Sequence, residues 1–169
     1  MIKILVLNGP NLNMLGKREP ALYGKETLDD IIQGLRERSG TLGVELEHVQ
    51  SNEEGVLISQ ILASREKFDG IILNPAAYTH TSVALRDALQ AVTVPCVEVH
   101  LTNTAAREEF RHVSLTAGAC LGQIMGFGAF GYHLALIGLV QYLKSGRGPA
   151  CSPRRTAADS PPRRAGRFN

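Results

Sequence analysis

The chain has 169 residues, of which 44% are hydrophobic and 20% charged, as in a globular domain long enough to bury a core. Residues 146–169 hold six arginines and one acid, a net charge of +5, so the total of +2 leaves −3 for residues 1–145. That mildly acidic body argues against a nucleic-acid interface. No apolar run reaches the length that a membrane span needs.

The cysteines and the C-terminal segment indicate the setting and the domain boundary. We expect residues 1–145 to form one folded domain, and residues 146–169, rich in Pro, Arg, Ser and Ala, to be a disordered basic tail. Cys96, Cys120 and Cys151 fit neither a disulfide framework nor a zinc site. The N-terminal apolar run is too short for a secretory signal. We therefore expect a reducing, cytoplasmic setting.

Strand and helix patterns alternate along the chain. Apolar or alternating runs predict strands at 3–8, 44–49, 70–74, 95–101 and 119–125. Helical patterns cover 27–40, 55–68, 81–92 and 129–145, with a short helix at 104–110. Thr27 is the expected cap of the first helix, and Thr81 or Ser82 that of the third. Residues 51–54, "SNEE", have the pattern of a capping box for the second.

Five β–α units in series predict an α/β fold in which helices cover both faces of a parallel sheet. Five strands suit the flavodoxin-like order 2-1-3-4-5, a three-layer sandwich. Ligands of such sheets bind beyond the carboxyl ends of the strands. Neutral hydrogen-bonding groups and two imidazoles crowd these ends: Asn8, Asn11, Asn13, Asn74, Tyr78, His80, His100, Thr102 and Asn103. They lack the carboxylate cluster that Mg²⁺ would need.

Two pairs of residues suggest chemistry at this edge. Glu98 and His100 alternate on the fourth strand, so both point to one side, and a glutamate there would fix the histidine's tautomer and raise its basicity. A purely structural pair is the alternative. His80 and Asp87 are seven residues apart, two helical turns, and can share one face. Asp87 alone is equally well explained as a solvated helix residue.

Two loops remain open to more than one interpretation. The segment "GFGAFG" (126–131) matches G-x-G-x-x-G, but no later strand carries the acid that a dinucleotide site requires. A tight turn with close helix packing is therefore favoured. The segment "GKREPALYGKE" (16–26) surrounds Tyr23 with Lys17, Arg18 and Lys25. It is either a mobile charged turn or a loop that carries a reactive tyrosine.

Several motifs in order strongly resemble one enzyme family. They are "LNGPNLNMLGKREPALYG", "NPAAYTHTSVALRDAL", "VPCVEVHLTNTAAREEFRHVS" and "GFGAFGYHLAL". All four resemble the type II 3-dehydroquinate dehydratases, and the resemblance covers residues 3 to 143. It implies a flavodoxin-like catalytic domain over residues 1–145 and an assembly of four trimers into a dodecamer. It also implies the removal of water from 3-dehydroquinate to give 3-dehydroshikimate, in the shikimate pathway or in quinate breakdown, without a metal or cofactor.

The resemblance assigns roles position by position. Tyr23 is implied to be the catalytic base, Arg18 the lid arginine beside it, and His100 the general acid. Asn11 is implied to stabilise an enolate through a bound water, and Glu98 to orient His100. The implied substrate-binding positions are Asn74, His80, Asp87, Leu101, Thr102 and Arg111. The position of Asp87 is implied to reach the site of a neighbouring subunit.

The chain departs from the family pattern at a few positions. The family usually has glycine where this chain has Ala76, so a methyl group must fit there and φ must suit alanine. Thr102 replaces a serine and keeps its hydroxyl. Thr104, Ala105 and Val113 stand where an aliphatic residue and two histidines are usual. None of these changes removes the implied base, acid or arginines.

Two other functions are weighed against the dehydratase. A lyase that forms a lysine imine needs a lysine at an apolar strand end, and none of the five lysines of the chain is placed there. A non-catalytic flavodoxin-like binding module would explain the departures as marks of a decayed site. We therefore expect a dehydratase with a small-molecule substrate and with neither a nucleic acid nor a membrane as partner.

Overall fold

The structure, a computed structural model, describes residues 1–17 and 25–146. Its centre is one parallel sheet of β1 (Ile2–Asn8), β2 (Val44–Gln50), β3 (Gly70–Asn74), β4 (Cys96–His100) and β5 (Gly122–Met125). The strand order is β2-β1-β3-β4-β5, which confirms the predicted topology. The central strands are buried from both sides, because every residue of β3 and of β4 is buried.

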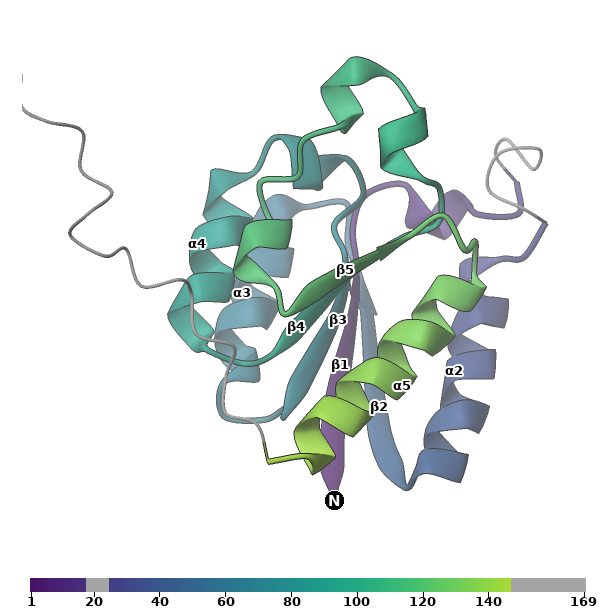
Figure 1. Ribbon diagram of the computed structural model, residues 1–169, viewed down its shortest axis with the longest axis vertical. Coiled ribbons are helices and arrows are strands. Elements are labelled where there is room, and N and C mark those ends of the chain that lie inside the picture. The colour runs from purple at the N-terminus through teal and green to yellow at the C-terminus, as the bar shows by residue number, and fades with distance from the viewer. Residues whose placement is uncertain (18–24, 147–169) are drawn as a thin grey trace, which may run out of the picture.

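Helices cover both faces of the sheet. α2 (Leu28–Leu42) and α5 (Phe130–Lys144) lie on one face, and α3 (Glu54–Ser64) and α4 (Val83–Val92) lie on the other (Figure 1). Successive residues of a strand point to opposite faces of the sheet, so the protein has two cores. In β1, Ile4 and Val6 pack toward α2 and α5, whereas Leu5 and Leu7 pack toward α3 and α4. Within the described part of the chain, none of the helices is long and apolar enough to cross a membrane.

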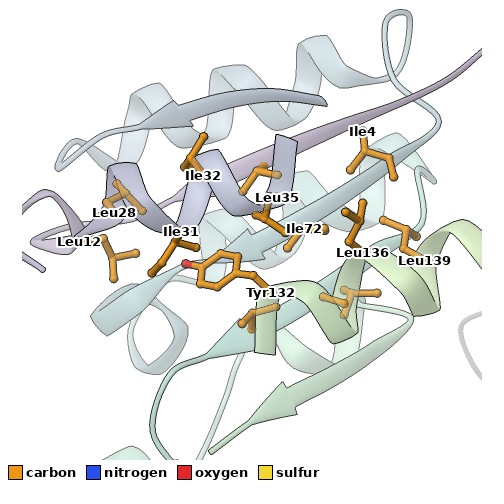
Figure 2. Close-up of a cluster of buried hydrophobic side chains, with 14 of the residues drawn as sticks. Ile4, Leu12, Leu28, Ile31, Ile32, Leu35, Ile72, Tyr132, Leu136 and Leu139 are labelled. Carbon is orange, nitrogen blue, oxygen red and sulfur yellow. The ribbon is translucent and has the colours of Figure 1, made fainter. Parts of the chain in front are cut away.

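The core under α2 and α5 includes a phenol. Aliphatic side chains fill most of it, and Tyr132 of α5 lies among them with its ring fully buried (Figure 2). A buried phenol needs a partner for its hydroxyl. The partners lie at the carboxyl ends of β1 and β3, so this side chain connects the core to the edge of the sheet where ligands are expected.

The helix caps only partly follow the predictions. Thr27 forms a complete capping box with Asp30, and Ser82 accepts a hydrogen bond from the Leu85 amide. The capping box predicted for α3 was wrong. Glu53 is the N-cap there, with no capping side-chain bond within the described residues, and the hydroxyl of Ser51 accepts the Glu53 amide instead.

The connection between β4 and β5 also differs from the prediction. In place of one helix at 104–110 there are two 3₁₀ turns, η3 (Thr104–Ala106) and η4 (Glu109–Arg111), and a third, η5 (Ala117–Ala119), precedes β5. Arg107 is extended, with φ −107° and ψ −162°, which separates η3 from η4. The side chain of Asn103 closes η3 by accepting the Ala105 amide. The turns η3 and η4 lie over the carboxyl end of the sheet, and the chain then returns past α4 to the start of β5, where the Leu121 amide donates to the Cys96 carbonyl (Figure 1).

Glycines allow the tight turns at this end of the molecule. Gly126 and Gly128 have φ values of 88° and 55°, so the segment 126–131 forms the predicted tight turn between β5 and α5. A Cβ at Gly9 would lie 2.6 Å from the carbonyl oxygen of Pro75. The loops after β1 and β3 therefore touch, and only glycine permits that approach.

Ala76 occupies the left-handed region of the backbone. Its φ is 51°, at the first residue of the 3₁₀ turn η2 (Ala76–His80). Such a conformation strains a residue that has a Cβ, at a cost of about 1 kcal/mol or more. A glycine at this position would adopt the same conformation without that strain.

We expect Ala76→Gly to stabilise the protein. Relief of the positive φ outweighs the greater chain entropy of glycine in the unfolded state, for a net gain of about 0.5–1 kcal/mol. Urea unfolding followed by circular dichroism would measure it. Ala77→Gly is the matched control, because Ala77 does not have a positive φ, and it should lower stability. A stability for Ala76→Gly equal to or below that of the original chain would refute the strain.

Candidate active site

A pocket of about 170 Å³ opens at the carboxyl ends of β1, β3 and β4. This is where a parallel sheet places its ligands. Seven of the predicted site residues line it: Asn11, Asn74, His80, His100, Leu101, Thr102 and Arg111. Thr104 and Arg107 also line it and were not predicted. None of the five lysines, which all lie in the described residues, is part of the lining.

His100 is held from behind by Glu98. The Nε2 atom of His100 lies 2.7 Å from Oε1 of Glu98, and both side chains point to the same side of β4, as predicted. Glu98 is completely buried, whereas His100 reaches the pocket. An ionised carboxylate only accepts hydrogen bonds, so Nε2 carries a proton. The Nδ1 atom has no hydrogen-bond partner among the described residues, which leaves it as the nitrogen that can exchange a proton with a ligand.

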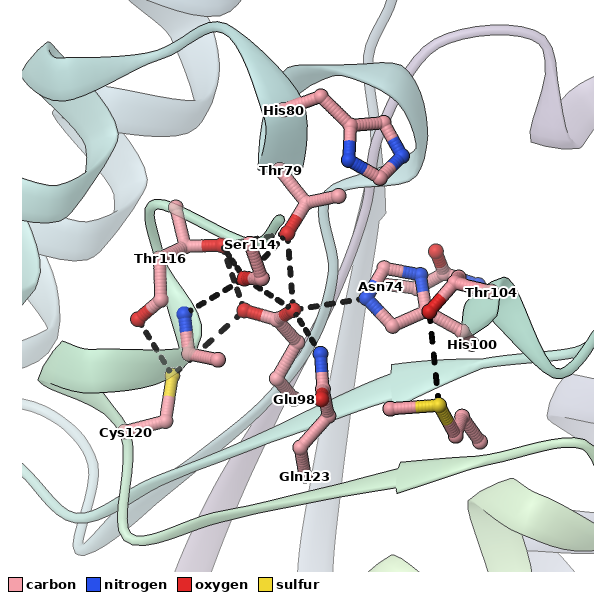
Figure 3. A network of polar contacts seen from close by, with 12 residues as sticks. Asn74, Thr79, His80, Glu98, His100, Thr104, Ser114, Thr116, Cys120 and Gln123 are labelled. Atoms are coloured by element: carbon pink, nitrogen blue, oxygen red, sulfur yellow. Dashed lines mark hydrogen bonds and ion pairs between the residues drawn. The ribbon is translucent and has the colours of Figure 1, made fainter. Parts of the chain in front are cut away.

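Four further polar groups surround the carboxylate of Glu98 (Figure 3). Three of them lie close to Oε1: Thr79 of η2 at 2.9 Å, Ser114 of the connection at 2.9 Å, and Gln123 of β5 at 2.7 Å. The fourth, Thr116, lies 2.5 Å from Oε2. We call Thr79, Ser114, Thr116 and Gln123 the cradle. Its members come from three separate segments, all of which converge on this one acid.

The cradle and His100 keep Glu98 ionised. Burial raises the pKa of this carboxyl, but hydrogen bonds from His100, Thr116 and Thr79, together with the attraction of His100, outweigh burial and lower the pKa to about 2. Glu98 is therefore an anion over the whole physiological range. A permanent negative charge therefore lies directly behind the Nε2–H group of His100.

A second polar cluster lies behind Asn74, the one member of it that lines the pocket. The hydroxyl of Tyr132 donates to Oδ1 of Asn8 at 2.5 Å and accepts from Nδ2 of Asn74 at 2.8 Å. Oδ1 of Asn74 accepts the Ala76 amide at 3.1 Å. Burial raises the pKa of Tyr132 far above its usual value, so the phenol stays protonated and donates. The carboxamide of Asn74 is thus held in one orientation.

The remaining imidazole of the pocket has a defined tautomer. Nδ1 of His80 lies 2.8 Å from the carbonyl oxygen of Val113, so Nδ1 donates and neutral His80 offers Nε2 as an acceptor. Only the backbone of Val113 takes part, and its side chain is exposed. The valine at this position therefore leaves the contact intact.

Two arginines of the 3₁₀ connection, Arg107 and Arg111, line the pocket. Nε of Arg111 lies 3.0 Å and Nε of Arg107 3.4 Å from Oε2 of Glu108. Arg107 also donates to the hydroxyl of Thr102 at 3.4 Å. The family resemblance singled out Arg111 alone, and the structure brings both arginines to the pocket.

Of the predicted site residues that the structure describes, two do not line the pocket: Glu98, which is buried behind His100, and Asp87. Arg18 and Tyr23 lie outside the described residues. Asp87 is exposed on α4 and does not line the pocket. The helical spacing assumed for His80 and Asp87 was wrong, because His80 belongs to η2 and Asp87 to α4. Among the described residues there is no group of three or more His, Cys, Asp or Glu that could hold a metal ion.

Comparison with known proteins identifies the family. The family model "Dehydroquinase class II" matches residues 2–140. The chain belongs to the class II dehydroquinases. A 3-dehydroquinate dehydratase from a Jannaschia species is 54% identical over 88% of this chain and 100% of its own length. One from Carboxydothermus hydrogenoformans is 57% identical over 85% of this chain and 93% of its own.

A solved structure agrees with this result. The type II dehydroquinase from Butyrivibrio crossotus superposes with a TM-score of 0.80 at 46% identity, covering 82% of this chain and 97% of its own. Class II dehydroquinases are enzymes, so the chain is a dehydratase and not an unrelated flavodoxin-like module. The two pairs of neighbours, His100 with Glu98 and Asn74 with Tyr132, give that dehydratase fold a pocket with fixed hydrogen-bonding directions.

We expect Glu98→Gln to remove part of the pH dependence of stability. A carboxyl with a pKa near 2 in the folded state and 4.5 in its ordinary state stabilises the fold at pH values above the ordinary pKa. That stabilisation is lost as the pH falls from about 5 to about 2, and its full size is about 3 kcal/mol.

Urea unfolding of both proteins between pH 2 and pH 7 would measure this. The original chain should lose more stability than Glu98→Gln over the acid window, so the difference between the two curves should shrink or reverse there. Other titrating groups, among them His48 and His133, are common to both proteins and cancel. Parallel curves would show that Glu98 is not held as an anion.

Proposed function

We propose that the protein removes water from 3-dehydroquinate to give 3-dehydroshikimate, by anti elimination through an enolate. The observation that supports this best is the His100–Glu98 pair, which opens onto a pocket with Asn11, Asn74 and Arg111 in its lining. The relatives from Jannaschia and Carboxydothermus hydrogenoformans are themselves named 3-dehydroquinate dehydratases. The reaction serves the shikimate pathway of aromatic biosynthesis in this proposal; quinate breakdown would use the same chemistry.

His100 acts as the general acid in this mechanism. The imidazolium holds one proton on Nε2, shared with Glu98, and a second on Nδ1, on the side without a protein partner. Transfer of the Nδ1 proton to the departing hydroxyl group releases water and leaves a neutral ring whose Nε2–H still donates to Glu98. Glu98 fixes the tautomer and the ring plane, and it stabilises the charge of the protonated form.

Tyr23 acts as the base that removes the proton next to the ketone. A free phenol has a pKa near 10, so only about 0.1% is ionised at neutral pH. Nearby cations favour the phenolate. Arg18, five residues before Tyr23, is the first such cation in this proposal, and Arg107 in the pocket lining is the second. Closure of the segment 16–26 over the pocket would also exclude water from the enolate.

The other lining residues bind the substrate and the intermediate. Arg111 offers a cationic fork to a carboxylate or an oxygen of the substrate. Asn74 is held by Tyr132, and His80 offers Nε2 to a hydroxyl group. Leu101 and Thr102 complete the wall beside His100, and Asn11 holds the water that stabilises the enolate oxygen. No step requires a metal or a cofactor.

We expect Tyr23→Phe and His100→Ala each to lower kcat by at least about 100-fold, the range that loss of a general base or acid causes. The rise in near-ultraviolet absorbance on adding 3-dehydroquinate measures turnover, because the product is a conjugated enone. Circular dichroism checks that both variants fold. Tyr142→Phe, in the last turns of α5 at the other end of the sheet, is the control and should keep the original rate. A near-normal kcat for Tyr23→Phe would exclude it as the base.

We also propose that the protein forms trimers that assemble into a dodecamer in the cytoplasm. Exposed apolar side chains, among them Phe110, Val113, Phe127 and Phe130, support burial against other copies. Asp87 is exposed on α4, and in this proposal it reaches the pocket of a neighbouring copy. Cys96 and Cys120 are free thiols, in keeping with a reducing compartment.

We expect Asp87→Ala to raise KM and weaken the trimer, while the isolated fold stays intact. Light scattering coupled to size-exclusion chromatography measures the assembly, and the enone assay measures KM. Gln90→Ala, an exposed residue on the same helix, is the control. Unchanged kinetics and unchanged mass for Asp87→Ala would remove its role at the subunit interface.

A further inference from the structure

The proton between Glu98 and His100 has two places to rest. It can stay on Nε2, which gives an imidazolium and a carboxylate, or it can cross the 2.7 Å hydrogen bond to Oε1, which gives a neutral ring and a neutral acid. Glu98 is fully buried and His100 nearly so. Burial penalises charge, so a bare pair in this place would favour the neutral form.

The neutral form would be a poor acid. In it, the ring keeps only the Nδ1 proton, and a neutral imidazole gives up that proton far less readily than an imidazolium does. The proposed general acid therefore works only if the shared proton remains on Nε2. Some feature of the site must make the separated charges the more stable arrangement.

The cradle supplies that feature through its hydrogen-bond directions. Oγ of Ser114 accepts the Ala117 amide at 2.8 Å, so its own proton is free for Oε1 of Glu98. The hydroxyl of Thr116 donates to Oε2, and the amide of Gln123 donates to Oε1. Thr79 lies within hydrogen-bond distance of Oε1, Ser114 and Thr116, and it completes the set. A protonated Oε1 could not accept these donors as well.

Other titratable groups around the pair do not replace the cradle. The thiol of Cys120 lies 4.0 Å from Oε2, and Cys96 packs beside Cys120 under the same face. On the pocket side, His80, Arg107 and Arg111 face His100, and the described lining contains no carboxylate. The two arginines repel an imidazolium, so the carboxylate behind the ring and its donors are what favour keeping the proton there.

We propose that Thr79, Ser114, Thr116 and Gln123 are positioning residues that hold Glu98 as a carboxylate, so that the proton shared with His100 stays on the ring. The role rests on the proposed function of His100 as the acid. None of the four touches the substrate in this proposal. They act through Glu98, and the state of the proton can be observed without any substrate.

The test compares Thr116→Val, which removes one donor at nearly constant shape, with Thr116→Ser, which keeps the hydroxyl. Nitrogen-15 spectra of histidine-labelled protein report which ring nitrogens of His100 are protonated, and the signal is assigned by its loss in His100→Ala. Infrared spectra report a protonated carboxyl group, assigned by its loss in Glu98→Gln. Ser64→Ala removes another buried hydroxyl, which donates to the Ile61 carbonyl at 2.6 Å, and is the control for stability.

We expect both nitrogens of His100 to be protonated in the original chain at acid to neutral pH. In Thr116→Val the share of rings that have lost the Nε2 proton and kept the one on Nδ1 should rise, and the carboxyl band should grow with it. This pattern differs from ordinary titration, which removes the Nδ1 proton first. The proton equilibrium should move by about 10- to 100-fold, the effect of one hydrogen bond to a charged group, with a matching fall in kcat, little change in KM, and recovery in Thr116→Ser.

The double variant Thr116→Val with Ser114→Ala removes two donors, in case the loss of one does not move the proton measurably. An unchanged His100 spectrum in this double variant would overturn the proposal, and so would a neutral ring with an unprotonated Nε2 in the original chain. Shifted spectra with an unchanged kcat would support the effect of the cradle on the shared proton but would contradict the role of His100 as the general acid. A loss of kcat in Thr116→Ser or Ser64→Ala equal to that in Thr116→Val would show a general loss of stability instead.

Discussion

A charged carboxylate without access to water is the constraint around which this site is built. Glu98 lies on an inner strand with no exposed surface, where an unpaired charge would cost several kcal/mol. The fold meets that cost by directing three segments toward one side chain. The turn after β3, the end of the long connection before β5, and β5 itself all place donors on it. The irregular course of the chain from 101 to 121 follows from this requirement.

The loops at the ends of β1 and β3 complete the other half of the pocket by close backbone contact. Gly9 lies against Pro75, and Asn11 and Ala76 both take positive φ values. Asparagine tolerates that conformation well, and alanine tolerates it poorly. The rim of the pocket is therefore shaped by the backbone, while its back wall is shaped by side-chain hydrogen bonds. Substitutions that change backbone conformation therefore affect the rim, whereas substitutions that remove a hydrogen-bond donor affect the back wall.

Regular elements were predictable because their signals are local. The apolar strands, the Thr27 and Ser82 caps and the strand order all follow from periodicity and chain-order rules, and so does the same-side placement of Glu98 and His100. The conformation of residues 104–119 was not predictable in this way, because it depends on contacts with residues far away in the sequence. Thr116 bonds to a side chain 18 positions away, and Ser114 to one 16 positions away. The SNEE segment has a valid capping pattern, but Ser51 is used in a tighter turn.

The roles of single residues were predictable only in part from the residues themselves. Alternation on a strand pointed to Glu98 and His100 as a pair, whereas Tyr23 and Arg18 drew attention only through their unusual local charge. Arg107 and Tyr132 had no sequence signal that set them apart from ordinary surface and core residues. They became visible once the sheet brought β1, β3 and the β4–β5 connection to the same edge.

The hydrogen bond between Tyr132 and Asn8 spans 124 positions of the chain. On the ribosome, residue 8 emerges early, and residue 132 emerges only when the catalytic domain is almost fully synthesised. The polar cluster behind Asn74 therefore cannot form during translation of β1 to β4, however well those strands pair. Binding capacity arises in one late event, when α5 docks, so truncated chains that lack this helix would expose the sheet without gaining a site for substrate.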